Sequence, residues 1–129
     1  MAANVLLVED NEQNMELASF LLEEAGWTVV TAMSFEEARR ELARQTPDVV
    51  LMDMELRGLD GLSLVAEFRR GGGPRFPILA LTAHAMRGDK ERFLAGGCDG
   101  YISKPIDTKT FAAEVARYLA RPAREDETT

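Results

Sequence analysis

The chain has 129 residues, 46% of them hydrophobic, which is enough for one domain with a sizeable core and too few for two. Its formal net charge of −7 argues against a nucleic-acid groove or an anionic membrane surface as the main partner, and fits a site that attracts a cation. The chain has one cysteine, no secretory signal at Met1–Asn4, and no apolar run near the roughly 20 residues of a membrane span. We therefore expect a cytoplasmic protein without an internal disulfide.

The start of the chain predicts a strand, an acidic turn and a helix. Asn4–Val8 is a short apolar run that ends at Glu9 and Asp10, and apolar residues then recur at helical spacing over residues 15–25. Thr28–Ala32 is rich in β-branched residues, which favours a second strand after this helix.

A second helix and a buried strand follow. Ser34 and Glu37 have the spacing of a capping box, which predicts a helix that ends before Pro47. Val49–Asp53 is apolar up to its last residue, as expected of a strand buried on both faces in the middle of a parallel sheet. Asp53 then stands at the carboxyl end of that strand, which is the edge where ligands bind in open α/β sheets.

The next segment continues the alternation. A turn at residues 57–61 precedes a helix with Leu64, Val65 and Phe68 on its inner face, and the glycines of residues 71–73 end that helix. A fourth strand is predicted over Pro77–Leu81, and it is closed by Thr82.

The last elements are a helix, a brief strand and a final helix. The fourth helix is predicted over residues 85–95, with the glycines at 96 and 97 as its stop. The fifth strand spans about Gly100–Ser103 and ends at Lys104 and Pro105. Asp107 or Thr108 is expected to cap the last helix, whose buried stripe is formed by Phe111, Val115 and Leu119.

Five alternations of strand and helix with short connections predict an α/β domain, in which helices cover both faces of a parallel sheet. We expect residues 1–120 to form this single domain. Residues 121–129 are polar and charged, so we expect a disordered tail.

The polar residues with chemical potential all lie at predicted strand ends. Glu9 and Asp10 follow the first strand, Asp53 ends the third, and Thr82 and Lys104 follow the fourth and fifth. These ends share one edge of a parallel sheet, so the three acids repel one another unless a cation is bound, and their oxygen ligands suit Mg²⁺. The Lys104 ammonium and the Thr82 hydroxyl are groups expected around a phosphoryl oxygen.

Four segments in order carry a family resemblance: Val8–Asn11, Leu51–Met54, Leu81–Ala83 and Ser103–Pro105. Together they resemble the acidic pair, phosphoacceptor strand, threonine motif and lysine-proline motif of the receiver domain of two-component response regulators. The resemblance extends from Val5 to about Leu119, and it is greatest to hybrid-kinase receivers and single-domain regulators. It implies a doubly wound, flavodoxin-like (βα)5 fold with sheet order 2-1-3-4-5.

The resemblance also implies a function for the acidic residues. Asp53 is expected to take a phosphoryl group from a phosphohistidine, so a sensor histidine kinase or a histidine phosphotransfer protein is the expected partner. Asp10 and Asp53 are expected to bind Mg²⁺ directly, Glu9 mainly through a metal-bound water, and Glu55 through its backbone carbonyl.

The other motifs imply that phosphorylation switches the conformation of the domain. Lys104 is expected to bind a phosphoryl oxygen, and the Lys104–Pro105 peptide to be cis. Thr82 is expected to hydrogen-bond another phosphoryl oxygen, and Tyr101 to change between outward and inward packing. The expected output is a changed surface on the fourth and fifth helices that binds a downstream protein. No DNA-binding or catalytic domain follows Leu119, so we expect the chain to dock onto another protein, to pass the phosphoryl group on, or to be a fragment of a longer protein. The negative net charge leads us to expect direct contact with neither nucleic acid nor membrane.

One position departs from the family pattern. Arg57 stands four residues after the phosphoacceptor, where the family usually has proline, and it removes the fixed backbone angle and puts a cation near the rim of the pocket. Three neighbours have simpler interpretations. The Glu55 side chain is expected to be an exposed acid beside the site, His84 a surface residue near its mouth, and Cys98 a small buried hydrophobe.

Two other functions fit the same topology. The first is a Mg²⁺-dependent phosphohydrolase with an aspartyl-phosphate intermediate. Such enzymes generally have an Asp-x-Asp motif at the nucleophile, where this chain has Glu55 in place of the second Asp, and a cap over the substrate, for which the sequence has no obvious segment. A flavin-binding protein needs a phosphate-cradling first turn, which the acidic pair disfavours. We therefore expect a signalling module that promotes its own phosphoryl transfer, and not an enzyme.

Overall fold

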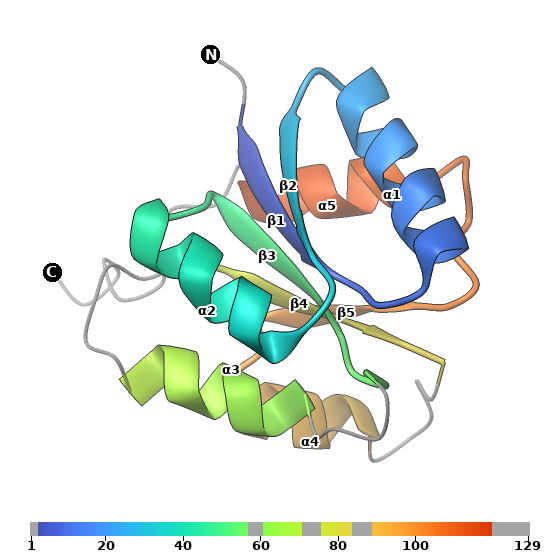
Figure 1. Ribbon diagram of the computed structural model, residues 1–129. Helices are drawn as coiled ribbons and strands as arrows, with labels where there is room; N and C mark the ends of the chain where they lie inside the picture. The colour runs from blue at the N-terminus through green and yellow to red at the C-terminus, as the bar shows by residue number, and fades with distance from the viewer. Residues whose placement is uncertain (1–2, 57–60, 71–75, 84–88, 120–129) are drawn as a thin grey trace, which may run out of the picture.

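The computed structural model describes residues 3–56, 61–70, 76–83 and 89–119. All the strands of this part run parallel in one sheet, in the order β2-β1-β3-β4-β5 (Figure 1). They are β1 (Asn4–Val8), β2 (Thr28–Ala32), β3 (Val49–Asp53), β4 (Ile78–Thr82) and β5 (Gly100–Ser103). The predicted fold class and strand order are confirmed.

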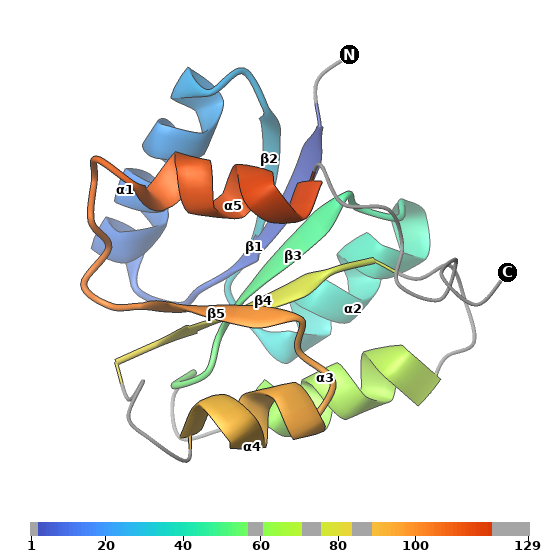
Figure 2. The ribbon, with the colours of Figure 1, turned by 180° about the vertical axis from the view of Figure 1, so that it is seen from behind.

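Helices cover both faces of the sheet. They are α1 (Glu12–Glu24), α2 (Phe35–Arg44), α3 (Gly61–Arg70), α4 (Asp89–Ala95) and α5 (Phe111–Leu119). Figure 2 shows α1 and α5 on one face of the sheet, while α2, α3 and α4 lie on the other. No helix within the described ranges is both long enough and apolar enough to span a bilayer.

Two core clusters, one on each face, hold the helices to the sheet. Leu64 and Phe93 belong to the cluster under α2, α3 and α4, and Leu22 and Phe111 to the cluster under α1 and α5. Every residue of β3 and β4 is buried, because these central strands are covered on both sides. Fully burying a leucine such as Leu51, which is 0% exposed, contributes about 1.5–3 kcal/mol.

The capping box at the start of α2 has one unexpected contact. The Glu37 N–H donates to the Ser34 hydroxyl over 3.1 Å, as expected. The Glu37 carboxylate accepts a hydrogen bond from the N–H of Met33 over 2.8 Å, one residue before the cap. The motif therefore fastens both the helix and the end of the loop that leads into it.

Two element boundaries differ from the sequence prediction. β4 is shifted by one residue, so Thr82 is its last residue. α5 begins at Phe111, because the Asp107 carboxylate accepts the Lys109 N–H over 2.9 Å and forms a separate turn before the helix. The described part of the fourth helix begins at Asp89. The expectations for Arg57, His84, the start of the fourth helix and the tail 121–129 lie outside the described residues.

Candidate functional site

The backbone brings the predicted polar residues to one edge of the sheet. Asp53 pairs with Leu81, and Thr82 with Ser103, at the carboxyl ends of their strands. Backbone hydrogen bonds continue just past the strand ends, where Glu9 N–H donates to Ala32 over 2.9 Å and Lys104 N–H donates to Thr82 over 2.8 Å. Hydrogen-bonded backbone at the strand ends therefore positions the residues on either side of Asp53.

Three carboxyl groups form a cluster at this edge. Carboxylate oxygens of Glu9, Asp10 and Asp53 all lie within 4.8 Å of one another. Glu9 and Asp53 are each only 2% exposed, while Asp10 is partly exposed. The N–H of Asn11 donates to Oε2 of Glu9 over 3.1 Å, and the Asn11 side chain caps α1 by accepting the Asn14 N–H over 2.9 Å. The helix start therefore also orients the buried acid.

The charge state of Glu9 reflects this crowding. Burial, together with a hydrogen bond to Asp53 and repulsion from its charge, raises the pKa of Glu9 to about 7. A bound cation would relieve this cost, and three carboxylates with one member open to water match the oxygen ligands and retained hydration that Mg²⁺ prefers. The residues present therefore fit a Mg²⁺ site.

Lys104 forms an ion pair with Asp53. Its Nζ lies 2.9 Å from Asp53 Oδ1, and the side chains are 16% and 3% exposed. Burial lowers the pKa of Lys104, but the hydrogen bond and the negative charge of Asp53 outweigh that effect and raise it. The Lys104 ammonium group is therefore a fixed positive charge beside the Asp53 carboxylate. The Lys104–Pro105 peptide bond is cis.

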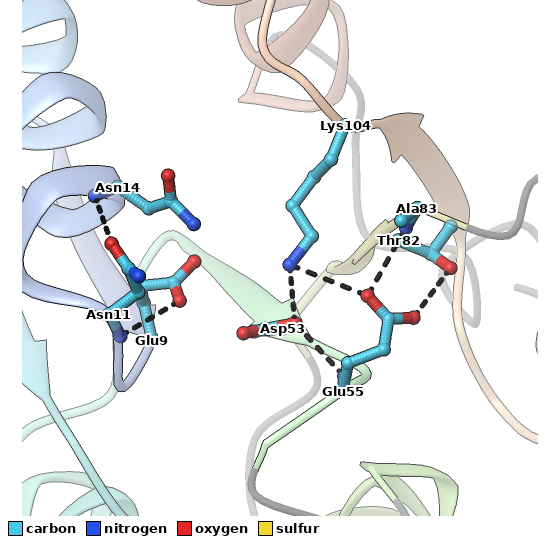
Figure 3. Close-up of polar contacts among 8 residues, drawn as sticks. All are labelled: Glu9, Asn11, Asn14, Asp53, Glu55, Thr82, Ala83 and Lys104. Carbon is cyan, nitrogen blue, oxygen red and sulfur yellow. Dashed lines mark hydrogen bonds and ion pairs between the residues drawn. The ribbon is translucent and has the colours of Figure 1, made fainter.

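Glu55 makes contacts that the sequence interpretation missed. Its N–H donates to Asp53 Oδ1 over 2.9 Å, while its carboxylate accepts the Thr82 hydroxyl over 2.8 Å and the Ala83 N–H over 3.1 Å (Figure 3). Its Oε1 is also 3.4 Å from Lys104 Nζ. The side chain is 32% exposed, so it is a partly buried member of the site and not only an acid beside it. The sequence held no signal for these contacts, because Glu55 lies in a turn after β3, where no regular period fixes the direction of a side chain.

Two further predicted residues lie in or against the core cluster under α2, α3 and α4. Tyr101 of β5 is half-buried and packs against the cluster under α2, α3 and α4. Cys98 is 1% exposed, and burial raises the pKa of its thiol to about 12, so it remains protonated and unreactive. Cys98 thus has the environment of the small buried hydrophobe expected from the sequence.

Comparisons with known proteins agree with this arrangement. The response regulator receiver domain family matches the chain over residues 5–116. The polar-differentiation response regulator DivK of Brucella ovis is 41% identical over 121 residues, which are 92% of this chain and 98% of that protein.

Solved structures are similar as well. The chemotaxis response regulator CheY4 of Vibrio cholerae has a TM-score of 0.85 and 28% identity, and the match covers 92% of this chain and 99% of that one. The receiver domain of the sensor histidine kinase PA1611 from Pseudomonas aeruginosa has a TM-score of 0.82 and 35% identity, and the match covers 94% and 100%. That crystal structure contains a magnesium ion coordinated in its active site cleft. The five-stranded arrangement is thus the flavodoxin-like fold that CheY4 also has.

Proposed function

The chain belongs to the response regulator receiver domain family of two-component signalling, and from this premise we propose that Asp53 is its phosphoacceptor. The donor is a phosphohistidine on a sensor histidine kinase or a histidine phosphotransfer protein. The observation that supports this proposal is the placement of Asp53 at the end of β3. Asp53 is 2% exposed, and its carboxylate belongs to the acidic cluster with Glu9 and Asp10 and contacts Lys104. The proposal keeps the cytoplasmic location expected from the sequence.

The transfer needs only a nucleophile and charge stabilisation. An Asp53 carboxylate oxygen attacks phosphorus, the phosphorus–nitrogen bond of phosphohistidine breaks, and the imidazole leaves with the bonding electron pair. Lys104, 2.9 Å from Asp53, binds an oxygen of the arriving group and offsets its charge. When bound, Mg²⁺ supplies further neutralisation of the phosphoryl oxygens.

The proposed metal ligands are the acidic cluster and one carbonyl. Asp10 and Asp53 bind the ion directly, and Glu9 acts through a metal-bound water. Glu55 contributes its backbone carbonyl. The fit of three clustered carboxylates to Mg²⁺ and the magnesium ion in the PA1611 receiver support this assignment.

The output of the module is a change of surface. Thr82, at 0% exposure on the end of β4, donates its hydroxyl to a phosphoryl oxygen and moves toward Asp53. Tyr101 then packs further inward, and the surface formed by α4 and α5 changes for a downstream protein. The module promotes its own phosphorylation and does not turn over a separate substrate.

The test is intact-mass measurement after incubation with acetyl phosphate and Mg²⁺. We expect one phosphoryl group per wild-type chain, none when a chelator removes the metal, and none on Asp53→Asn. Asp48→Asn is the matched control, because Asp48 lies exposed at the other end of the same strand, and it should behave as wild type. Uptake by Asp53→Asn at the wild-type rate, or steady turnover of a phosphate monoester by the wild type, would contradict the proposal.

A further inference from the structure

The Glu55 carboxylate accepts hydrogen bonds from two groups at the site and forms an ion pair with a third. These are the Thr82 hydroxyl at 2.8 Å, the Ala83 N–H at 3.1 Å and the Lys104 ammonium at 3.4 Å, hereafter the donor set. The donors come from β4, from the residue after it, and from the residue after β5. Figure 3 shows all three directed at the two oxygens of one carboxylate. The donor set therefore binds an anionic group with two or more oxygens.

A phosphoryl group on Asp53 needs the same donors. Lys104 already contacts Asp53 Oδ1 over 2.9 Å, and Glu55 N–H contacts the same oxygen, so a group attached to Asp53 arises directly beside the donor set. The Thr82 hydroxyl and the Ala83 N–H each donate one strong hydrogen bond at a time, whereas the Lys104 ammonium has three N–H donors, and two anions placed together repel one another. Glu55 and a phosphoryl group therefore compete for the Thr82 and Ala83 donors.

We propose that the Glu55 side chain is an internal anion that occupies the donor set in the unphosphorylated protein and is displaced by the phosphoryl group. This inference rests on the proposed function of Asp53. It makes Glu55 a positioning residue: its carboxylate holds Thr82 and Lys104 in place before transfer, and it lowers the affinity of the site for the group that arrives.

The exposure of the Glu55 side chain allows its contacts with the donor set to break. The Glu55 side chain is 32% exposed, so its carboxylate can turn to water without an unpaired charge being buried. Thr82, by contrast, is 0% exposed, and its hydroxyl requires a partner in either state. Displacement of Glu55 thus leaves Thr82 with the phosphoryl oxygen as its new acceptor, and this exchange links phosphorylation to the position of Thr82.

The first experiment measures affinity for a phosphoryl mimic. Beryllium trifluoride is titrated by calorimetry at a Mg²⁺ concentration that saturates each protein. Glu55→Gln keeps the side-chain shape but loses the charge and one acceptor oxygen, so it should bind the mimic roughly tenfold more tightly than wild type, since charge-assisted hydrogen bonds are the strong ones. Glu24→Gln is the control, because Glu24 is an exposed acid at the end of α1, and it should match wild type.

The second experiment separates competition for the donors from a simple effect of charge. In a double-mutant cycle, the gain from Glu55→Gln should be clearly smaller in a Thr82→Ala background, because one contested donor is already gone. The Ala83 amide resonance should report the same exchange. In wild type it should move when the mimic binds, and in Glu55→Gln it should already be shifted before the mimic is added.

The outcomes distinguish this inference from the proposed function. A wild type that takes up a phosphoryl group at Asp53 but binds the mimic no more weakly than Glu55→Gln overturns the inference alone. An equal gain from Glu55→Gln with and without the Thr82→Ala substitution also overturns it, because Glu55 would then act only as a nearby charge. A wild type that accepts no phosphoryl group overturns the proposed function, and this inference with it.

Discussion

Glu9 is the residue whose charge depends most directly on its place in the acidic cluster. Burial and its hydrogen bond to Asp53 raise its pKa from 4.5 to about 7. A raised carboxyl pKa means that the folded state binds this proton more tightly than the unfolded chain does. The contribution of Glu9 to stability is therefore fully present below pH 4.5, and it is lost as the pH rises through about 7.

This linkage predicts the behaviour of Glu9→Gln in the presence of a chelator. Glutamine carries no charge at any pH, so the variant should gain free energy of unfolding relative to wild type between pH 4.5 and about 7, by an amount on the order of 2 kcal/mol. Denaturant unfolding at pH 5 and pH 8 measures the difference. Glu24→Gln controls for the loss of a surface charge, and a Glu9→Gln difference that is the same at both pH values would refute the assignment.

Asp10 is the member of the cluster that is open to water and is proposed to bind Mg²⁺ directly. Asp10→Asn should weaken Mg²⁺ binding by roughly tenfold or more, because even indirect partners of a metal site commonly contribute that much. Calorimetric titration with Mg²⁺ provides the measurement, with Asp48→Asn as the control. Superimposable isotherms for Asp10→Asn and wild type would rule out a metal at this cluster.

At this scale the sequence predicted which residues meet and missed one contact among them. Glu9, Asp10, Asp53, Thr82 and Lys104 could be placed together because parallel strands share an edge, and that rule depends only on where each strand ends. The Glu55 carboxylate lies in a turn after β3, where no period fixes the direction of a side chain. Its contact with Thr82 and Ala83 is therefore set by the fold and not by the local sequence.

At the scale of elements, β4 and β5 connect the site to the proposed output surface. Thr82 ends β4, pairs with Ser103, and lies one strand away from Tyr101 on β5. If Thr82 detects the phosphoryl group and Tyr101 follows it, acceptance and switching are separable properties of the sheet edge.

Thr82→Ala should therefore still accept a phosphoryl group at Asp53 but fail to switch. The hydroxyl contributes about 1.5–3 kcal/mol as a hydrogen bond to an anion, which is enough to shift a two-state equilibrium by roughly one to two powers of ten. Spectra of Tyr101 and of the α4 amides, recorded with and without beryllium trifluoride, give the measurement. Equal shifts in wild type and Thr82→Ala would mean that Tyr101 is only a packed strand residue.

A second polar cluster fastens α3 to the starts of β4 and β5. Arg69 donates to the carbonyls of Gly97 and Phe76 over 3.0 and 2.7 Å, and pairs with Asp99 over 2.7 Å. Asp99 also accepts the Ile78 N–H over 2.9 Å. The two charged side chains are 16% and 3% exposed, so this is a buried ion pair with several hydrogen bonds.

Arg69→Met should destabilise the fold by about 3–5 kcal/mol, because removing one partner leaves a buried charge without its counterion. Arg39→Met is the control, since its ion pair with Glu67 is exposed and should contribute little. Chemical unfolding of both variants gives the comparison. If Arg69→Met costs no more than Arg39→Met, the cluster does not stabilise the fold.

The sequence predicted the start of α2 correctly but not the start of α5. Ser34 and Glu37 predicted the start of α2, because the first residue of a capping box is the N-cap of the helix. Asp107 did not predict the start of α5, because an aspartate side chain can also form a local turn. Here the Asp107 carboxylate does so by accepting a hydrogen bond from the Lys109 N–H. The sequence alone does not distinguish an aspartate that caps a helix from one that forms a local turn.

At the scale of the whole molecule, periodicity and spacing predicted the layers of the fold but not the order of its strands. Apolar runs such as Val49–Asp53 indicated strands covered on both faces, and the structure has helices on both sides of the sheet. The order 2-1-3-4-5 came from the family resemblance, because short connections allow several arrangements of five parallel strands.

The central claim is that phosphorylation occurs at Asp53, and the most direct measurement locates the phosphoryl group. The wild-type chain is phosphorylated with acetyl phosphate and Mg²⁺ and reduced with borohydride, which converts an aspartyl phosphate to homoserine, and its peptides are sequenced by mass spectrometry. The account predicts homoserine at position 53 and at no other aspartate. Homoserine at position 10, or a phosphoryl group retained on His84 with Asp53 unmodified, would contradict it.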